Sequence, residues 1–163
     1  MQYMNKVFLL IGGNMGDRLQ NLRQAKQELE FTCGPVVNSS SVYETAAWGK
    51  TDQEAFLNQA LELHTELPAQ ELIITILEVE EKLGRRRLEK FGPRIIDIDI
   101  LFYNDAVIDE PNLSVPHPQL PYRRFALAPM NEIAPQLVHP VLQQTIAQLL
   151  EECVDQLPVK LIS

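Results

Sequence analysis

The sequence is poor in cysteine, with only Cys33 and Cys153 among its 163 residues. Two cysteines are too few for a disulfide framework, and this pair lacks the close spacing of a zinc site. We therefore expect both to be reduced, partly buried thiols. The sequence also lacks a charged-then-apolar signal peptide and any apolar run of the about 20 residues that a membrane-spanning helix needs. These absences predict a cytoplasmic protein that does not contact a membrane.

Positive charge is also scarce, because 22 acidic residues outnumber 14 basic ones and give a net charge of −8. Proteins that bind nucleic acid do so largely by neutralising phosphates, so this balance argues against a nucleic-acid partner. Internal repeats and linkers are absent, and the length is enough to bury a core without disulfides. We expect residues 1–163 to form a single domain, which we also expect to be monomeric.

The common nucleotide-binding motifs are missing as well. Gly12-Gly13-Asn14-Met15-Gly16 follows the apolar run Val7 to Ile11, but it has neither Walker spacing with Lys-Ser/Thr nor the pattern Gly-x-Gly-x-x-Gly. We interpret it first as a structural turn between a strand and a helix, with Asp17 as the helix N-cap.

The most informative stretch runs from Lys90 to Tyr103, where Gly-Pro-Arg precedes Ile-Ile-Asp-Ile-Asp-Ile-Leu-Phe-Tyr. From Ile95 onward its β-branched and aromatic residues alternate with aspartates, which predicts a strand. Side chains two apart on a strand share a face, so Asp97 and Asp99 project together while the isoleucines enter the core. Adjacent carboxylates repel each other unless a cation lies between them.

Magnesium fits this pair, because it takes one or two carboxylates and completes its coordination with water and phosphate oxygens. Six of the basic residues lie between Lys82 and Arg94, a local anion site that suits a small phosphorylated ligand. Together these features indicate metal-assisted phosphoryl transfer. The alternative is that the arginines form ion pairs with the aspartates and hold a loop to the sheet.

The run Gly-Pro-Arg-x-x-Asp-Ile-Asp-Ile-Leu, after a basic and an aromatic residue, resembles the signature of the 6-hydroxymethyl-7,8-dihydropterin pyrophosphokinase family of folate biosynthesis. The turn Gly12 to Gly16 and Val115-Pro116-His117 also match that family, and the resemblance spans roughly residues 7–135. It implies an α+β fold with a ferredoxin-like core, a mostly antiparallel sheet and helices on both faces. It also implies transfer of pyrophosphate from ATP to the pterin hydroxymethyl group, with AMP as the second product.

The resemblance assigns roles residue by residue. It implies two Mg²⁺ ions held by Asp97 and Asp99. The residues expected to act in catalysis are Arg85, Arg87, Arg94, Asp97 and Asp99. The residues expected to bind ATP are Glu80, Arg85, Arg94, Ile100, Ser114, His117 and Arg123. The residues expected to bind the pterin are Thr45, Ala46, Trp48, Phe56, Asn58, Asp97 and Phe125, with the two phenylalanines stacking on the ring.

The resemblance also leads to expectations for two loops and for Arg124. Loops around Trp48 and Arg86 are expected to close over the substrates and exclude water. Arg124 stands where the family commonly has a small residue, so we expect it to contact only solvent.

Further elements are predicted by periodicity. We expect a helix from Asp17 to Gly34, strands over 36–44 and 56–65, and a helix from Pro68 to Gly84. The turn at Asn104-Asp105 predicts a hairpin from the signature strand into Val107-Ile108. Residues 111–121 should be irregular, helices should cover 125–133 and 141–152, and the end of the chain gives no signal.

Two other classes of function remain open from the residues alone. A metal-dependent phosphohydrolase would use the same aspartates but needs further carboxylates or histidines, of which no cluster is evident. A ligand-binding module with no catalysis would account for the fold but not for two aspartates beside an arginine run.

Overall fold

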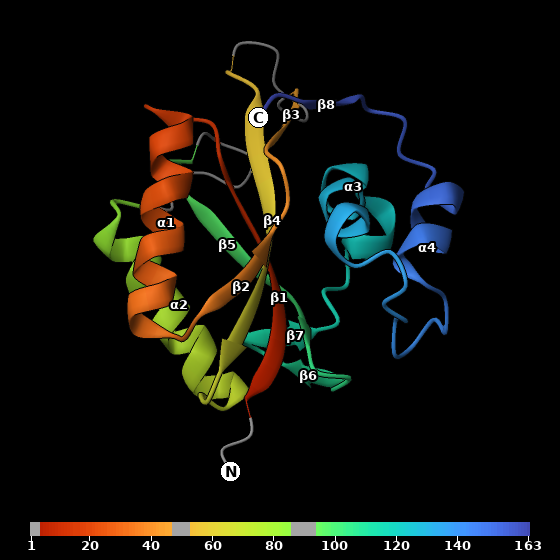
Figure 1. The fold of residues 1–163 in the computed structure, drawn as a ribbon, viewed down its shortest axis with the longest axis horizontal. Coiled ribbons are helices and arrows are strands. Elements are labelled where there is room, and N and C mark those ends of the chain that lie inside the picture. The colour runs from red at the N-terminus through yellow and green to blue at the C-terminus, as the bar shows by residue number, and fades with distance from the viewer. Residues whose placement is uncertain (1–3, 47–52, 86–93) are drawn as a thin grey trace.

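The computed structural model describes residues 4–46, 53–85 and 94–163, and it contains an antiparallel sheet with helices on both faces (Figure 1). The strands of the main sheet are β1 (Asn5–Gly13), β2 (Val36–Ser39), β3 (Tyr43–Thr45), β4 (Phe56–Thr65), β5 (Asp97–Tyr103) and β8 (Val159–Leu161). Their order is β5-β1-β4-β3-β8, with β2 also paired to β4, and β6 (Ile108–Glu110) and β7 (Leu113–Val115) form a separate two-stranded sheet.

Two crossover helices define the ferredoxin-like core. Helix α1 (Arg18–Thr32) connects β1 to β2, and α2 (Ala69–Lys82) connects β4 to β5. Each connection passes over one intervening strand, so neighbouring strands are antiparallel throughout. The other face carries α3 (Arg124–Ile133) and α4 (Ile146–Glu152), preceded by the short 3-10 helix η1 (Leu120–Tyr122). The predicted fold class is confirmed.

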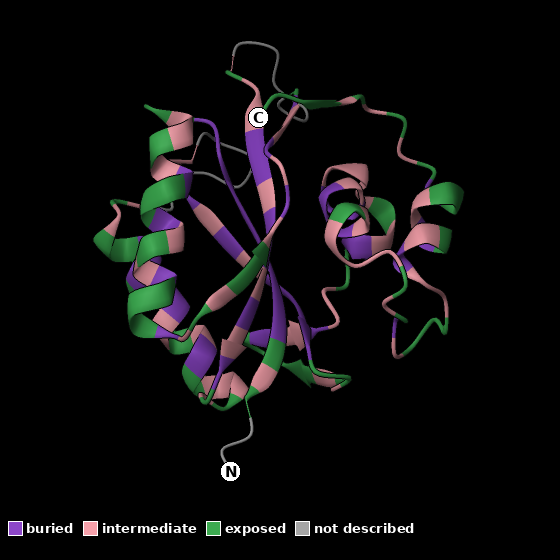
Figure 2. Cartoon of the chain, viewed as in Figure 1, coloured by how far each residue is buried: buried purple, intermediate pink, exposed green. Residues whose placement is uncertain are grey.

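Alternation along β1 places its side chains in two cores. Val7, Leu9 and Ile11 pack with α1 and α2 on one face, whereas Phe8 and Leu10 pack with α3 and α4 on the other. Figure 2 shows buried residues along this strand and exposed residues on the outer faces of the helices. A strand buried on both faces has a continuous apolar sequence, which is why its centre could be predicted.

The start of α1 also agrees with the prediction. The side chain of Asp17 accepts a hydrogen bond of 3.2 Å from the backbone N–H of Gln20 and so caps the helix. None of the described helices is long and apolar enough to cross a membrane.

The predicted hairpin between the signature strand and residues 107–108 is wrong, because β6 pairs with β7. The backbone N–H of Asn104 donates to the carbonyl of Lys6, and the Asn104 side chain accepts from the Lys6 N–H. These bonds hold the turn against β1, which already occupies one edge of β5. Residues 111–121, expected to be irregular, contain β7 and most of η1.

Two other boundaries differ from the predictions. The strand expected over 36–44 is divided into β2 and β3. The helix expected from residue 141 begins only at Ile146, because Thr145 and Gln148 form a capping box and Gln143 has a φ of 58°. A left-handed residue cannot continue an α-helix, so periodicity alone placed the helix start too early.

Candidate active site

The site begins with one row of residues across the sheet. In the strand register, Gly12 of β1 lies opposite Asp97 of β5 on one side and opposite Asn58 of β4 on the other. Directly opposed residues of antiparallel strands project to the same face. Gly12 has no side chain, which leaves the space over it to the Asn58 amide.

The two glycines are required by close packing. A Cβ at Gly12 would lie 2.2 Å from Oδ1 of Asn58, and a Cβ at Gly13 would lie 2.3 Å from the carbonyl oxygen of Ile95. Real Cβ atoms do not approach other atoms so closely, and a methyl group at either position would displace its neighbour. Gly12-Gly13 is therefore a structural feature of this turn, as predicted, and Gly12 also borders the site.

The Asn14 side chain links two backbone segments beside the cavity, a role that was not predicted. Its side chain accepts a 2.8 Å hydrogen bond from the Arg94 N–H and donates a 3.0 Å bond to the carbonyl of Glu54. Asn14 is 3% exposed, so these bonds are shielded from water. The segments that lead into β4 and β5 are thus fixed relative to each other. The glycines beside Asn14 gave a signal for a turn, but not for these distant partners.

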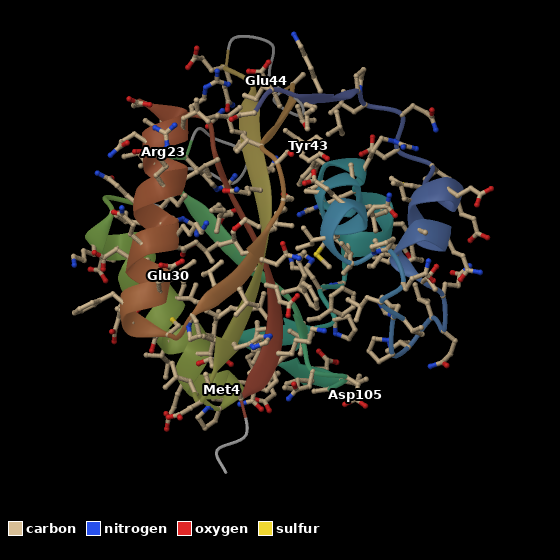
Figure 3. All side chains as sticks on the ribbon, viewed as in Figure 1. Met4, Arg23, Glu30, Tyr43, Glu44 and Asp105 are labelled. Atoms are coloured by element: carbon tan, nitrogen blue, oxygen red, sulfur yellow. The ribbon has the colours of Figure 1, made fainter. Side chains whose placement is uncertain are left out.

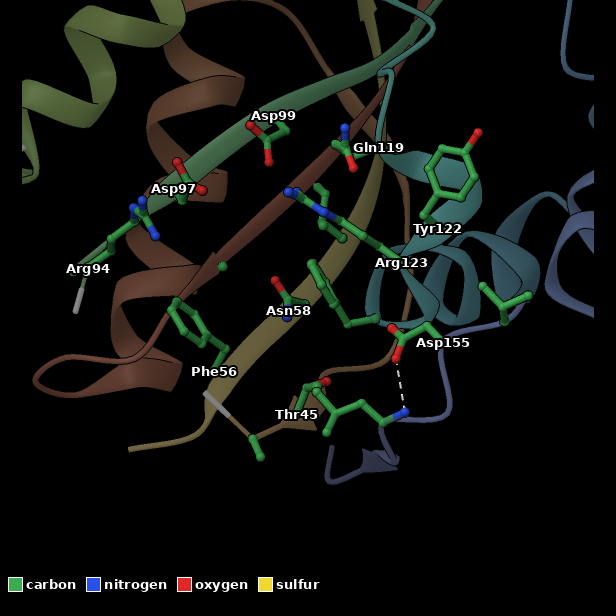
Figure 4. A pocket seen from close by; sticks show the side chains of 16 residues that line it. Thr45, Phe56, Asn58, Arg94, Asp97, Asp99, Gln119, Tyr122, Arg123 and Asp155 are labelled. Carbon is green, nitrogen blue, oxygen red and sulfur yellow. Dashed lines mark hydrogen bonds between the residues drawn. The ribbon is translucent and has the colours of Figure 1, made fainter. Parts of the chain in front are cut away.

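A cavity of about 670 Å³ opens over the row (Figure 4). Pockets of this size accept small organic ligands. Nine predicted site residues line it: Thr45, Ala46, Phe56, Asn58, Arg94, Asp97, Asp99, Arg123 and Phe125. The remaining lining residues are Leu10, Gly12, Gln119, Tyr122, Val154, Asp155 and Leu157. Sequence positions more than 100 residues apart therefore meet in one cavity.

Asp97 and Asp99 project to the cavity, whereas Ile98 and Ile100 are buried in the opposite core. The pKa of Asp99 is raised from 3.8 to about 7, mainly by burial and in addition by the nearby charge of Asp97. The positive charge of Arg123 acts in the opposite direction. Two half-buried carboxylates on the same face of β5 form a site of negative potential, and a cation would relieve their repulsion.

The donor set fits magnesium. The described residues contain no group of three or more His, Cys, Asp or Glu side chains that could hold a metal by themselves. Mg²⁺ needs only one or two carboxylates when water and phosphate oxygens supply the rest, while zinc usually needs three or four protein ligands. Asp97 and Asp99 would hold the metal at the cavity wall.

Glu80 and Arg85 form a buried network beside this pair. Nη1 of Arg85 lies 2.8 Å from Oε2 of Glu80 and 2.9 Å from Oδ1 of Asp97. Glu80 is 2% exposed and also accepts a 2.7 Å bond from the Ile98 N–H. Burial raises the pKa of Glu80, and the Ile98 and Arg85 contacts lower it. In this structure Glu80 orients Arg85 and β5, and it does not line the cavity.

The bond from Ile98 to Glu80 identifies the outer edge of β5. The Ile98 N–H points away from β1. Backbone groups two residues apart on a strand point to the same edge, so those of Ile100 also face away from β1. The Ile100 side chain is buried, which leaves its backbone as the part that can reach a ligand. Ser114 lies on β7, which packs near β5.

His117 approaches the same edge after β7. Its backbone N–H donates to the carbonyl of Leu101, and its Nδ1 accepts a 3.1 Å bond from the Gln119 N–H. Burial lowers the pKa of His117 to about 4, with Arg123 contributing in the same direction. At neutral pH the ring is therefore uncharged and has an Nε2–H to donate, since Nδ1 is an acceptor.

The start of α3 brings Arg123 and Phe125 to the cavity. The guanidinium carbon of Arg123 lies 5.6 Å from the centroid of the Phe125 ring, within cation–π range. The sheet side of the cavity is lined by Phe56 on β4 and by Thr45, its paired neighbour on β3. The Thr45 hydroxyl is buried and has no hydrogen-bond partner among the described residues. A ligand between the two phenylalanines could satisfy it.

The end of the chain supplies three cavity residues that were not predicted: Val154, Asp155 and Leu157. Arg124, expected to contact only solvent, instead binds Asp155, so that expectation is wrong. No motif or periodicity marked this segment, because its position depends on distant contacts. Trp48, Arg86 and Arg87 lie outside the described residues, and so do the loops expected to close over the substrates.

A family model described as 7,8-dihydro-6-hydroxymethylpterin-pyrophosphokinase matches residues 8–135. The chain belongs to this family. It is 43% identical over 143 residues to a 2-amino-4-hydroxy-6-hydroxymethyldihydropteridine pyrophosphokinase of Synechocystis, covering 87% of this chain and 73% of that protein. It is 42% identical to a protein of the same name from Aquifex aeolicus, covering 91% of this chain and 92% of the relative.

The solved structures support the fold. A triple mutant of Plasmodium falciparum HPPK-DHPS superposes with a TM-score of 0.75 at 20% identity, covering 93% of this chain and 44% of the longer one. The family and its named relatives establish the activity. The chain is a pyrophosphokinase that transfers pyrophosphate from ATP to 6-hydroxymethyl-7,8-dihydropterin in folate biosynthesis.

Proposed function

We propose that the cavity holds the pterin between Phe56 and Phe125, that ATP lies along the outer edge of β5, and that Mg²⁺ joins the two at Asp97 and Asp99. One observation carries this assignment. The aspartates stand between an end lined by aromatic and amide side chains and an edge with arginines and a histidine. We propose that residues 1–163 act as one domain, as a monomer and in the cytoplasm.

The pterin end is argued from its lining. Two phenyl rings offer flat apolar surfaces, and stacking on a planar heterocycle adds to the burial of area. The Asn58 amide and the Thr45 hydroxyl then provide donors and acceptors for the edge of the ring. The absence of a side chain at Gly12 makes room for the Asn58 amide, whose Oδ1 occupies the space that a Cβ would fill.

At the ATP end, Arg85, Arg94 and Arg123 supply fixed positive charge, and Arg87 is assigned there from the resemblance. Neutral His117 donates a hydrogen bond from Nε2 to a phosphate oxygen instead of neutralising charge. The backbone of Ile100 and the Ser114 side chain face the nucleoside. Glu80 acts indirectly, by holding Arg85 in place.

In the reaction the hydroxyl oxygen of the pterin bonds to the β-phosphorus of ATP, and the bond from that phosphorus to the oxygen bridging the α-phosphate breaks. AMP leaves, and the hydroxyl proton is released to solvent. Two Mg²⁺ ions would supply positive charge to the triphosphate and lower the pKa of the hydroxyl group. The arginines stabilise the charge that develops on the leaving oxygen, and one such residue can contribute about 10³-fold to the rate.

The test is an assay with ATP, Mg²⁺ and 6-hydroxymethyl-7,8-dihydropterin, with nucleotides separated by chromatography. AMP formed only when pterin and metal are both present supports the proposal. Orthophosphate release would favour the phosphohydrolase, and ADP would indicate transfer of one phosphoryl group. Asp97→Asn and Asp99→Asn should each lower kcat at least 100-fold in a folded protein, and unchanged turnover in both would remove the metal assignment. Light scattering after gel filtration tests the monomer.

A further inference from the structure

The C-terminal segment, defined here as residues 153–157, lies beyond residues 8–135 that match the family. We propose that this segment forms a wall of the pterin end of the cavity, in which Leu157 contacts the substrate and Asp155 is a positioning residue for the start of α3. This inference rests on the proposed placement of the pterin between Phe56 and Phe125.

The segment is fixed at both ends. Cys153 is buried in the core between the sheet and α3. Beyond the segment, β8 pairs with β3, with Val159 opposite Thr45. A chain held at both sides of a gap has little freedom in between, so its side chains are presented to the cavity in a defined way.

Asp155 makes three hydrogen bonds that lock the segment. Its Oδ2 accepts a 3.1 Å bond from the Arg124 N–H, its Oδ1 accepts a 2.9 Å bond from the Leu157 N–H, and its carbonyl accepts a 2.9 Å bond from Nε of Arg124. Figure 4 shows the bond to Leu157 and places Asp155 on the side of the cavity away from Asp97.

The contact with Arg124 also completes α3. The helix begins after Arg123, whose side chain makes no capping hydrogen bond. The first N–H groups of a helix need partners from outside, and a carboxylate there interacts favourably with the helix dipole. Asp155 therefore supplies from a distant segment the cap that the local sequence lacks. Because Arg123 and Phe125 flank Arg124, the same bond fixes both cavity residues.

The wall lies at the pterin end. Thr45 is the last residue of β3, the strand that pairs with β8, and Ala46 follows it. Leu157 precedes β8 by two residues and lines the same cavity. The apolar Leu157 side chain lines the cavity with them, and an apolar group there excludes water from the hydrogen bonds of the ring edge. A side chain in this position restricts which substituents the ring system can carry.

Four variants test the proposal by steady-state kinetics with thermal melting as a folding check. Leu157→Ala should raise KM for the pterin about fivefold to tenfold and leave KM for ATP within twofold. Asp155→Ala should raise KM for the pterin at least tenfold and also lower kcat, because Arg123 loses its support. Asp155→Asn keeps one acceptor oxygen and should have a smaller effect. Gln156→Ala, an exposed neighbour outside the cavity lining, is the matched control and should behave as the unaltered chain.

The inference is overturned if Leu157→Ala and Asp155→Ala are folded and keep KM for the pterin within twofold. It is also overturned if Leu157→Ala changes both KM values equally, or if Gln156→Ala reproduces its effect. If Asp155→Ala does not fold, Leu157→Ala decides alone. Absence of pterin-dependent AMP with the unaltered chain would instead contradict the proposed function, so the two failures are distinguishable.

Discussion

Asp99→Asn should stabilise the metal-free protein while it removes turnover. The Asp99 carboxyl has a pKa of about 7 in the folded protein and 3.8 in a model peptide, mainly because it is buried and also because Asp97 is near. A pKa that is raised by folding means that the folded state binds more protons than the unfolded state between these two values. Stability therefore falls as pH rises through this range.

The size of the effect follows from the pKa difference. At 1.36 kcal/mol per pH unit, a rise from 3.8 to about 7 corresponds to about 4 kcal/mol for a group sealed from water. Water reaches Asp99 through the open cavity and screens its charge, which reduces the expected gain to about 1–2 kcal/mol. For a chain of this length, the melting temperature should rise by about 3–6 °C.

The assay is thermal unfolding of both proteins at pH 4.5 and pH 8, without metal and with Mg²⁺ and ATP. Asp99→Asn should be more stable at pH 8, with a smaller difference at pH 4.5, where the natural carboxyl is mostly protonated. Ligand should raise the melting temperature of the natural chain more than that of the variant. Asp105→Asn is the control, because Asp105 is exposed on a turn far from β3, one of the strands that line the cavity (Figure 3). A lower stability of Asp99→Asn at pH 8 would refute the reasoning.

Three other variants test single contacts. Phe56→Ala should weaken pterin binding about tenfold in calorimetry, with little change in ATP binding, and equal losses would contradict stacking. Phe125 is less suitable for this test, because Arg123 lies over its ring and its removal would also disturb that arginine. Glu80→Ala should lower the free energy of unfolding, measured by urea titration, by about 3 kcal/mol, because Arg85 loses a buried partner. A loss below about 1 kcal/mol would mean that the Glu80–Arg85 network contributes little to stability. Gly12→Ala should raise KM for the pterin about tenfold by displacing the Asn58 side chain. An unchanged value would show that the position of the Asn58 amide does not affect pterin binding.

Local pattern accounts for the parts that were predicted correctly. Alternation from Ile95 to Tyr103 placed Asp97 and Asp99 on one face, because the strand period is two whatever the partner strand is. The apolar run of β1 and the Asp17 cap of α1 are similarly short-range properties of the chain. The roles of His117 and of the two phenylalanines came from the family resemblance instead.

The protonation states and ion pairs of the site residues could not be predicted from the sequence. His117 was expected to bind ATP, but nothing in the sequence indicated that burial and the neighbouring Arg123 lower its pKa to about 4. Glu80 was placed at the nucleotide, and the structure shows it holding Arg85 and the Ile98 N–H in a buried network. Both states depend on how much water and which charges surround the group, and these are set by packing.

The sequence by itself determined the reactive strand, the turn before α1, the alternation of strands and crossover helices, and the family to which they point. These features depend on residues a few positions apart, whose steric and hydrogen-bonding preferences act locally. Only the tertiary structure decided that β6 pairs with β7, that Asn14 joins the segments before β4 and β5, and that Asp155 caps α3. The Asn14 and Asp155 contacts join groups tens of residues apart, and so do the Asn104–Lys6 bonds that hold the turn before β6 against β1. These groups meet only once the sheet and both cores have formed.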